Sequence, residues 1–212
     1  MKKRSILSLV LAVVMLFSVL GVFPMTVSAA GSTYASDDAA IGAGYYFRTG
    51  AEGSATYYNS IYTACEEVGE GGTVTVLHNF ELATAAQGVG KTWTDPKTYT
   101  IDGNGKTLTY KQNRVFDIAC SNLTIKDLTI RQDVNSAISF GQVRKSSMVV
   151  FENVTATATQ TGWGFIPIYG SLTLKGSSSI TCTGTTAANN FAVRIDNDGN
   201  SDVTTTRVVT KA

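Results

Sequence analysis

The sequence predicts an all-β chain built by repeating one short unit along an axis. The first observation is the triplet YTI at residues 99–101, which recurs as LTI at residues 123–125, about 24 residues later. The second is that comparable triplets stand at similar intervals, at residues 74–76, 149–151 and 172–174. In a strand, such a triplet points two apolar side chains inward and one side chain outward. A repeat of roughly 20 to 50 residues indicates a solenoid, because one repeat buries its apolar face only against its neighbours.

Two further sets of triplets divide each repeat into three short strands. We expect the second set at residues 116–118, 138–140, 166–168 and 193–195. We expect the third set at residues 108–110, 128–130, 154–156 and 180–182. Turn sequences such as DGNG at residues 102–105 separate the sets. Three strands per repeat close a three-sided coil, and each coil pairs in parallel with the next.

The outward positions of these strands are rich in threonine, which suits a β surface. We expect one outward threonine per strand, whereas a flat ice-binding array would need two. At the C-terminal side, residues 203–205 are expected to continue the first set of strands and residues 209–211 the third. With these segments included, the three sets of triplets predict about five to six coils. The last coil exposes Val208 and Val209 with no visible cap, so we expect further coils or another chain at this open end.

Residues 1–29 have the pattern of a secretory signal peptide. Three basic residues precede an apolar run, and the run ends in a small-residue exit at Val27-Ser28-Ala29. A transmembrane anchor is the alternative, but Pro24 and the small exit favour cleavage. The mature chain then carries 17 − 3 = 14 basic and 16 acidic residues, a balance that does not indicate nucleic-acid binding. We expect a secreted or cell-surface protein with no membrane contact after cleavage.

Residues 30–54 are predicted to form a tail with a capping strand, and residues 55–68 a helix. Tyr58, Ile61, Tyr62 and Cys65 have helical spacing, and Gly69 ends the pattern. A short amphipathic helix at this place would cover the open end of the coils. The β-helix itself is expected to occupy residues 55–212.

The chain contains three cysteines, Cys65, Cys120 and Cys182. Three cysteines cannot all pair with one another. Inward-facing positions favour buried small hydrophobic side chains. The alternative is a disulfide or a reactive thiol.

Three segments carry a resemblance to a known group of proteins. They are GGTVTVL at residues 71–77, IDGNGKTLTY at residues 101–110 and FDIACSNLTIKDLTI at residues 116–130. Together with the capping helix, they resemble the right-handed parallel β-helix of the pectin-lyase-like superfamily over about residues 55–212, in the style of bacterial secreted and surface repeat proteins. The resemblance implies several functions: pectate and pectin lyases, polygalacturonases, other polysaccharide-active enzymes, and surface or adhesin modules without chemistry.

The sequence lacks the catalytic motifs that the enzymes of this superfamily would imply. Polygalacturonase-like hydrolases need clustered carboxylates and carry Asn-Thr-Asp, Asp-Asp and Gly-His-Gly motifs, none of which occurs here. Pectate-lyase-like enzymes use an arginine base and aspartate-bound calcium, which Arg194 with Asp196 and Asp198 resembles, but their Arg-x-Pro-x-x-Arg and Trp-Ile-Asp-His signatures are missing. The only histidine, His78, is expected in a turn or cap. We therefore predict no catalytic residues and favour a non-catalytic module for carbohydrate or host-matrix interaction, with a polysaccharide lyase or hydrolase, or a fragment of one, as the alternative.

A loop at residues 196–202 is a candidate calcium site. It holds Asp196, Asp198 and Asp202 around a glycine, and carboxylates are ligands that Ca²⁺ prefers. It departs from an EF-hand loop, because Arg194 stands at the place of the first ligand. The alternative is a solvated turn between coils, and no other cofactor is expected.

Two loop tryptophans, Trp93 and Trp163, are candidate carbohydrate-binding residues. Both lie among Gly, Thr and Pro residues. A flat aromatic ring exposed on a loop can stack on the C–H face of a sugar. The alternative is packing over the coil. The expected partner is a polysaccharide or a cell-surface glycan.

Overall fold

The structure is a computed structural model. It describes residues 31–83, 87–89, 97–112, 114–120, 122–133, 139–158, 166–183, 192–195 and 209–211. The signal peptide predicted at residues 1–29 lies outside this part. Among the described residues, no helix combines the length and the apolar composition needed to span a membrane.

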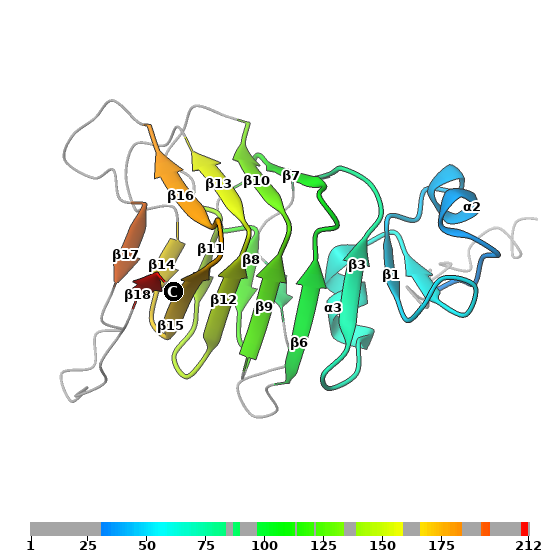
Figure 1. The fold of residues 1–212 in the computed structure, drawn as a ribbon, viewed down its shortest axis with the longest axis horizontal. Helices are drawn as coiled ribbons and strands as arrows, with labels where there is room; N and C mark the ends of the chain where they lie inside the picture. Colours follow the sequence, from blue (N-terminus) through cyan, green and yellow to red (C-terminus); the bar gives the residue numbers. More distant parts are fainter. Residues whose placement is uncertain are drawn as a thin grey trace, which may run out of the picture. The chain divides into compact units, whose positions relative to one another are not determined.

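Three sheets make up the described coils (Figure 1). Sheet A contains β1 (Phe47–Thr49), β2 (Thr56–Tyr58), β3 (Thr73–Val76), β6 (Thr98–Asp102), β9 (Asn122–Lys126), β12 (Met148–Glu152), β15 (Ser171–Lys175) and β18 (Val209–Lys211). Sheet B contains β4 (Phe80–Leu82), β7 (Thr107–Tyr110), β10 (Thr129–Gln132), β13 (Thr155–Ala158) and β16 (Ser179–Cys182). Sheet C contains β5 (Gln87–Val89), β8 (Phe116–Ile118), β11 (Gly141–Val143), β14 (Ile166–Ile168) and β17 (Val193–Ile195).

From β3 onward each sheet takes every third strand of the chain, and neighbouring strands pair in parallel. The strands β6, β7 and β8 form one coil, and β9 to β11 and β12 to β14 form the next two. Tyr99, Leu123, Val149 and Leu172 pair in succession across sheet A, which confirms the predicted period. The predicted fold class, a parallel β-solenoid with coils of about 24 residues and a short N-terminal helix, is therefore confirmed.

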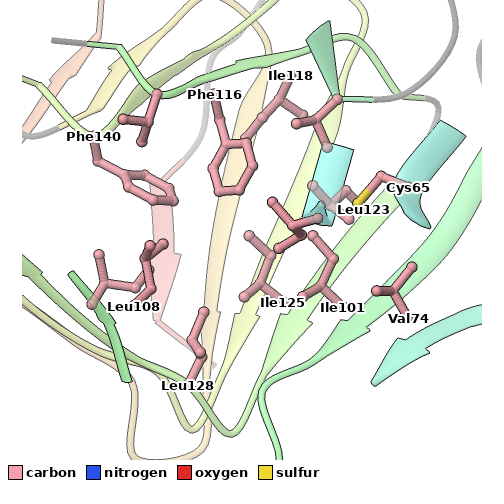
Figure 2. Close-up of a cluster of buried hydrophobic side chains, with 14 of the residues drawn as sticks. Cys65, Val74, Ile101, Leu108, Phe116, Ile118, Leu123, Ile125, Leu128 and Phe140 are labelled. Atoms are coloured by element: carbon pink, nitrogen blue, oxygen red, sulfur yellow. The ribbon is translucent and has the colours of Figure 1, made fainter. Parts of the chain in front are cut away.

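The apolar side chains of the coils meet in one continuous core (Figure 2). Ile101, Leu123 and Ile125 come from successive strands of sheet A and are almost completely buried. Phe116 and Phe140 face them from the side of sheet C, with ring centroids 5.2 Å apart in an edge-to-face arrangement. Such pairs add to the stabilisation from buried area.

Three predicted registers are wrong by two residues. Val74 pairs with Ile101 rather than Tyr99, and Leu108 pairs with Ile130 rather than Leu128. Likewise, Ile180 pairs with Ala156 rather than Val154. Leu128 is buried, but it lies at the corner before β10. A shift of two residues keeps every side chain on the same face, so the alternation alone could not distinguish the two registers.

The predicted strand at residues 138–140 is also wrong at the two residues that the structure describes, Ser139 and Phe140. The strand in this coil is β11, in which Gly141 pairs with Phe116. Phe140 is fully buried just before β11. The apolar residue that indicated a strand therefore lies at the corner of the coil that precedes the strand. At Gly141 a Cβ atom would lie 2.6 Å from the carbonyl oxygen of Phe116, which makes a side chain impossible without a shift.

Two further expectations are corrected. The strand at residues 209–211 joins sheet A beside β15 rather than the third set of strands, and residues 203–205 lie outside the described residues. Sheet B presents two outward threonines on two of its strands, Thr107 and Thr109 of β7 and Thr155 and Thr157 of β13. The expectation of one outward threonine per strand is therefore wrong for this sheet.

The N-terminal helix is shorter than predicted and is preceded by a strand. Residues 56–58 form β2, and the helix α3 covers only Ile61–Glu67. Ser60 sets its start, because its Oγ accepts a hydrogen bond from the N–H of Thr63 at 3.4 Å. A second helix, α2 (Asp37–Gly42), lies in the predicted tail, where Ser36 caps it in the same way.

Candidate functional site

The three sheets end in different ways at the N-terminal side of the coils. Sheet A is extended by β1 and β2, which pair antiparallel, and sheet C is covered by α3, which packs against β5. In sheet B, β4 is the edge strand and pairs with β7 on one side only among the described strands. The other side of β4 therefore has no partner strand in this part of the chain.

A groove with a volume of about 420 Å³ lies beside this free edge. Its walls come from β4, from the start of β1 and from the residues that lead into α3. Its volume is within the range of small-ligand sites, which is about 300 to 1,000 Å³.

Two stacked rings form the aromatic part of the groove. The rings of Tyr46 and His78 lie 4.9 Å apart with an interplanar angle of 26°. His78 Nδ1 is 2.7 Å from the carbonyl oxygen of Asn79. Because a carbonyl only accepts, Nδ1 is the donor of this contact, and in the neutral imidazole Nε2 is then an acceptor. His78 is exposed between β3 and β4, at the cap position expected from the sequence.

Several polar groups of the groove are already held by the protein. Ser60 caps α3, and Asn79 Oδ1 accepts a hydrogen bond from the N–H of Thr107 at 2.9 Å. The Glu81 carboxylate lies 2.8 Å from Lys111 Nζ. These contacts fix the walls, and they leave those side chains little capacity for a ligand.

Three polar groups remain open to a ligand. The side-chain amide of Asn59, the hydroxyl of Tyr46 and Nε2 of His78 have no hydrogen-bond partner among the described residues. Together they supply donors and acceptors beside an aromatic surface. That combination suits a ligand with several hydroxyl groups and an apolar face.

The base of the groove is apolar and rigid. Phe47 and Phe80 meet edge to face with centroids 5.0 Å apart, and Ile61 and Leu82 are buried beside them. The helix α3 is tied to a residue distant in sequence, because the Tyr62 hydroxyl donates to the carbonyl oxygen of Val115 at 2.8 Å. The groove is therefore shaped before a ligand arrives, which lowers the entropic cost of binding.

The far end of α3 is held by a buried lysine. Lys97 Nζ donates to the carbonyl oxygens of Glu66 at 2.6 Å and Val68 at 2.7 Å, and it lies 5.4 Å from the centroid of the Tyr99 ring. The last carbonyls of a helix have no partner within the helix, and a cation there also complements the helix dipole. Lys97 thus joins the helix that borders the groove to the first strand of the next coil.

A second polar cluster lies on the outer face of sheet C. Arg144 donates through Nε and Nη2 to the Asp117 carboxylate, and Gln142 Nε2 donates to the same carboxylate at 3.1 Å. Arg114 donates to Gln142 Oε1 at 3.3 Å. The hydrogen bond to Asp117 raises the pKa of Arg144. This arginine is held protonated and paired, so it does not supply a catalytic base.

All three cysteines are free thiols. Cys65 and Cys120 are completely buried, as expected from the sequence, whereas Cys182 is half-buried. Burial raises the pKa of Cys65 to about 12 and that of Cys120 to about 11. Both are therefore protonated and unreactive at neutral pH.

The site residues predicted from the sequence all lie outside the described residues. This applies to the tryptophans Trp93 and Trp163 and to the carboxylates Asp196, Asp198 and Asp202. In the part of the chain that the structure describes, no three His, Cys, Asp or Glu side chains converge as a metal site would require. Tyr46, Asn59 and the edge of β4 were not predicted as parts of a site. The one signal for them in the sequence is the only histidine, which stands beside an amide and an aromatic residue at residues 78–80.

Comparison with known proteins found no matching family model, no matching curated protein and no matching solved structure.

Proposed function

We propose that this chain is a secreted bacterial surface module with a right-handed, pectin-lyase-like β-helix that binds carbohydrate without cleaving it. The observation that supports this most is the groove at the free edge of β4. Its stacked Tyr46 and His78 rings lie beside the open amide of Asn59. The ligand would be part of a polysaccharide or of a cell-surface glycan.

The chemistry of a sugar fits these walls. A pyranose has an apolar C–H face that packs against an aromatic ring, and its hydroxyl groups project around the edge of that face. The amide of Asn59 can both donate to and accept from adjacent hydroxyls, and His78 Nε2 can accept from one. Orientation comes from these few polar groups, and contact area comes from the rings and the apolar base.

The remaining features of the proposal come from the sequence. Residues 1–29 would direct secretion, and the mature chain would contact neither membrane nor nucleic acid. Trp93 and Trp163 would add sugar contacts, and Asp196, Asp198 and Asp202 would hold calcium.

A glycan array with the purified protein tests the proposal. We expect retention of at least one class of glycan, and we expect a variant with Asn59→Ala and His78→Ala to lose it. Thr124→Ala on the outer face of sheet A serves as the control and should bind as the native protein does. An empty array, or equal retention by the groove variant, would remove the groove from the proposal.

The enzymatic alternative has its own test. Pectin and other acidic polysaccharides are incubated with the protein, with and without Ca²⁺, and unsaturated products and new reducing ends are measured. We expect neither to rise above background. Calcium-dependent cleavage would replace the binding module with a polysaccharide lyase.

A further inference from the structure

The free edge of β4 presents unpaired backbone groups. In a parallel pair, alternate residues direct both their N–H and their C=O toward the same neighbouring strand. The backbone N–H and C=O of Leu82 are directed toward β7, because its carbonyl oxygen accepts a hydrogen bond from the N–H of Lys111 at 3.1 Å. The preceding residue, Glu81, therefore directs its N–H and C=O away from β7. These two groups have no hydrogen-bond partner among the described residues.

The residue that carries these backbone groups borders the groove. Glu81 lines it, and its carboxylate is turned to Lys111. Phe80 and Leu82, on either side, point their side chains into the core. An amide donor and a carbonyl acceptor of β4 thus lie at the groove, which the open side-chain amide of Asn59 also lines.

Hydrogen-bonding groups of this kind are suited to an amide. A trans amide directs its C=O and its N–H to opposite sides, so it can accept from the N–H of Glu81 while it donates to the Asn59 side chain. A hydroxyl group next to the amide can then donate to the Glu81 carbonyl. An amide that forms hydrogen bonds on both sides should bind such a site more tightly than a single hydroxyl does. With a hydroxyl, one of the polar groups of the site would lose its water without gaining a hydrogen bond.

We infer that the groove is selective for N-acetylated amino sugars, whose acetamido group pairs with the Glu81 backbone. The sugar ring lies against Tyr46 and His78, and the acetyl methyl group contacts Phe47 and Phe80. This inference rests on the proposed carbohydrate binding and adds the class of sugar. Recognition of an acetamido group by a strand edge uses the same hydrogen bonds that extend a sheet.

An extended peptide also carries amides, but the edge is too short to favour one. The strand β4 has three residues, of which only Glu81 directs its backbone outward. At the next outward position toward the N-terminus, Asn79, the carbonyl is already bonded to His78 Nδ1 at 2.7 Å. A pairing peptide strand would therefore find the backbone N–H and C=O of only one residue. A single acetamido group needs no more than that.

The test compares two trisaccharides with the same backbone linkage, tri-N-acetylchitotriose and cellotriose, which lacks the acetamido groups. We expect the acetylated sugar to bind at least about tenfold more tightly in calorimetric titration, the equivalent of one or two good hydrogen bonds. In an NMR titration of the native protein, the Glu81 amide should shift with the acetylated sugar and not with cellotriose. Equal affinity for the two sugars, or an unmoved Glu81 amide, would overturn the inference.

Two variants at one position separate the backbone from the side chain. Glu81→Pro removes the N–H that faces the groove without removing a bond to β7, since proline is tolerated on a sheet edge. We expect it to bind the acetylated sugar no better than cellotriose. Glu81→Ala removes the ion pair with Lys111 but keeps the N–H, and it should keep the preference. A preference retained in Glu81→Pro, or lost equally in both variants, would contradict the inference.

The outcomes also distinguish this inference from the proposed function. If non-acetylated glycans bind and the acetyl group gives no advantage, carbohydrate binding stands and the acetamido site is wrong. If no sugar binds, the proposed function fails as well. If an extended peptide shifts the Glu81 amide and no sugar does, the edge is a peptide site. Should Glu81→Pro fail to fold, as shown by its melting curve, the Glu81 amide shift in the native protein decides.

Discussion

The N-terminal cap, residues 31–68, and the coils that follow it bury their side chains in different ways. In the cap, tyrosines are anchored by polar contacts: the Tyr57 hydroxyl donates to Asp37 Oδ1 at 3.0 Å, and Arg48 Nε lies 3.3 Å from the same carboxylate. In the coils, equivalent apolar positions stack from strand to strand, as Leu123 does between Tyr99 and Val149. The hydroxyl of Tyr99 is buried without a conventional hydrogen-bond partner among the described residues.

This difference follows from what each region has as a neighbour. A coil strand finds a copy of its own pattern on either side, so its backbone is satisfied and its side chains only need to match in size. The cap has no such copy beyond it and must end the sheets with contacts that occur once. At sheets A and C it does so with β1 and α3. At β4 no strand of the described part of the chain pairs with the edge, and the proposed binding groove lies there.

The largest effect is expected from a truncation in the middle of the coils. Phe151 is fully buried between neighbouring strands of sheet A. We expect Phe151→Ala to lower the free energy of unfolding by about 3 to 5 kcal/mol, because the cavity can collapse only partly. Urea denaturation measures the change. A loss below about 1 kcal/mol would mean that the coils are packed more loosely than the structure indicates.

A smaller effect is expected where the cap and the coils are joined. Lys97→Met should lower the free energy of unfolding by about 2 kcal/mol, because the carbonyls of Glu66 and Val68 would lose a charged donor. Lys106→Met, at a more accessible lysine without an ion pair among the described residues, is the matched control. Equal melting temperatures for the two variants would show that Lys97 does not hold the helix.

Alkaline pH should weaken the boundary between the two regions. Cys65 of α3 and Cys120 of the coils have pKa values raised by burial to about 12 and about 11. A thiol with a raised folded pKa contributes stability that is complete below its unfolded pKa, near 9, and is lost as the pH rises through the folded value. At pH 10 we expect a loss of about 1 kcal/mol for each thiol.

Melting curves between pH 8 and pH 11 measure this loss. The double variant Cys65→Ala, Cys120→Ala should lose less stability over the same interval, although the buried hydroxyl of Tyr99 titrates in the same direction. Identical slopes for the native and variant proteins would mean that the two thiols are not buried as protonated groups.

The smallest effect is expected inside the cap. Tyr57→Phe removes only the hydroxyl that donates to Asp37, and we expect it to cost about 1 kcal/mol, since the bond is partly exposed. Thermal melting measures the change. A cost as large as that of Phe151→Ala would mean that one polar contact, rather than the coils, limits the stability of the whole domain.

The coils were the part of this fold that local sequence could predict. The alternation at residues 99–101 and 123–125 is confirmed because each side chain's face depends only on its place along its own strand. The registers at Val74, Leu128 and Val154 were wrong because a shift of two residues leaves the alternation unchanged. At residues 56–58 the cap was misread as a helix, since buried tyrosines fit both periods over so short a segment.

The sequence by itself determined the repeat, the three-sided coil and the inward faces of its strands, because these depend on residues close together in the chain. Only the tertiary structure decided that β4 would be left as an open edge and that Tyr46, Asn59 and His78 would meet beside it. These residues come from three separate segments. Their meeting depends on how the antiparallel strands and the short helix dock on the first coil, and that docking is fixed by contacts distant in sequence, such as the one between Tyr62 and Val115.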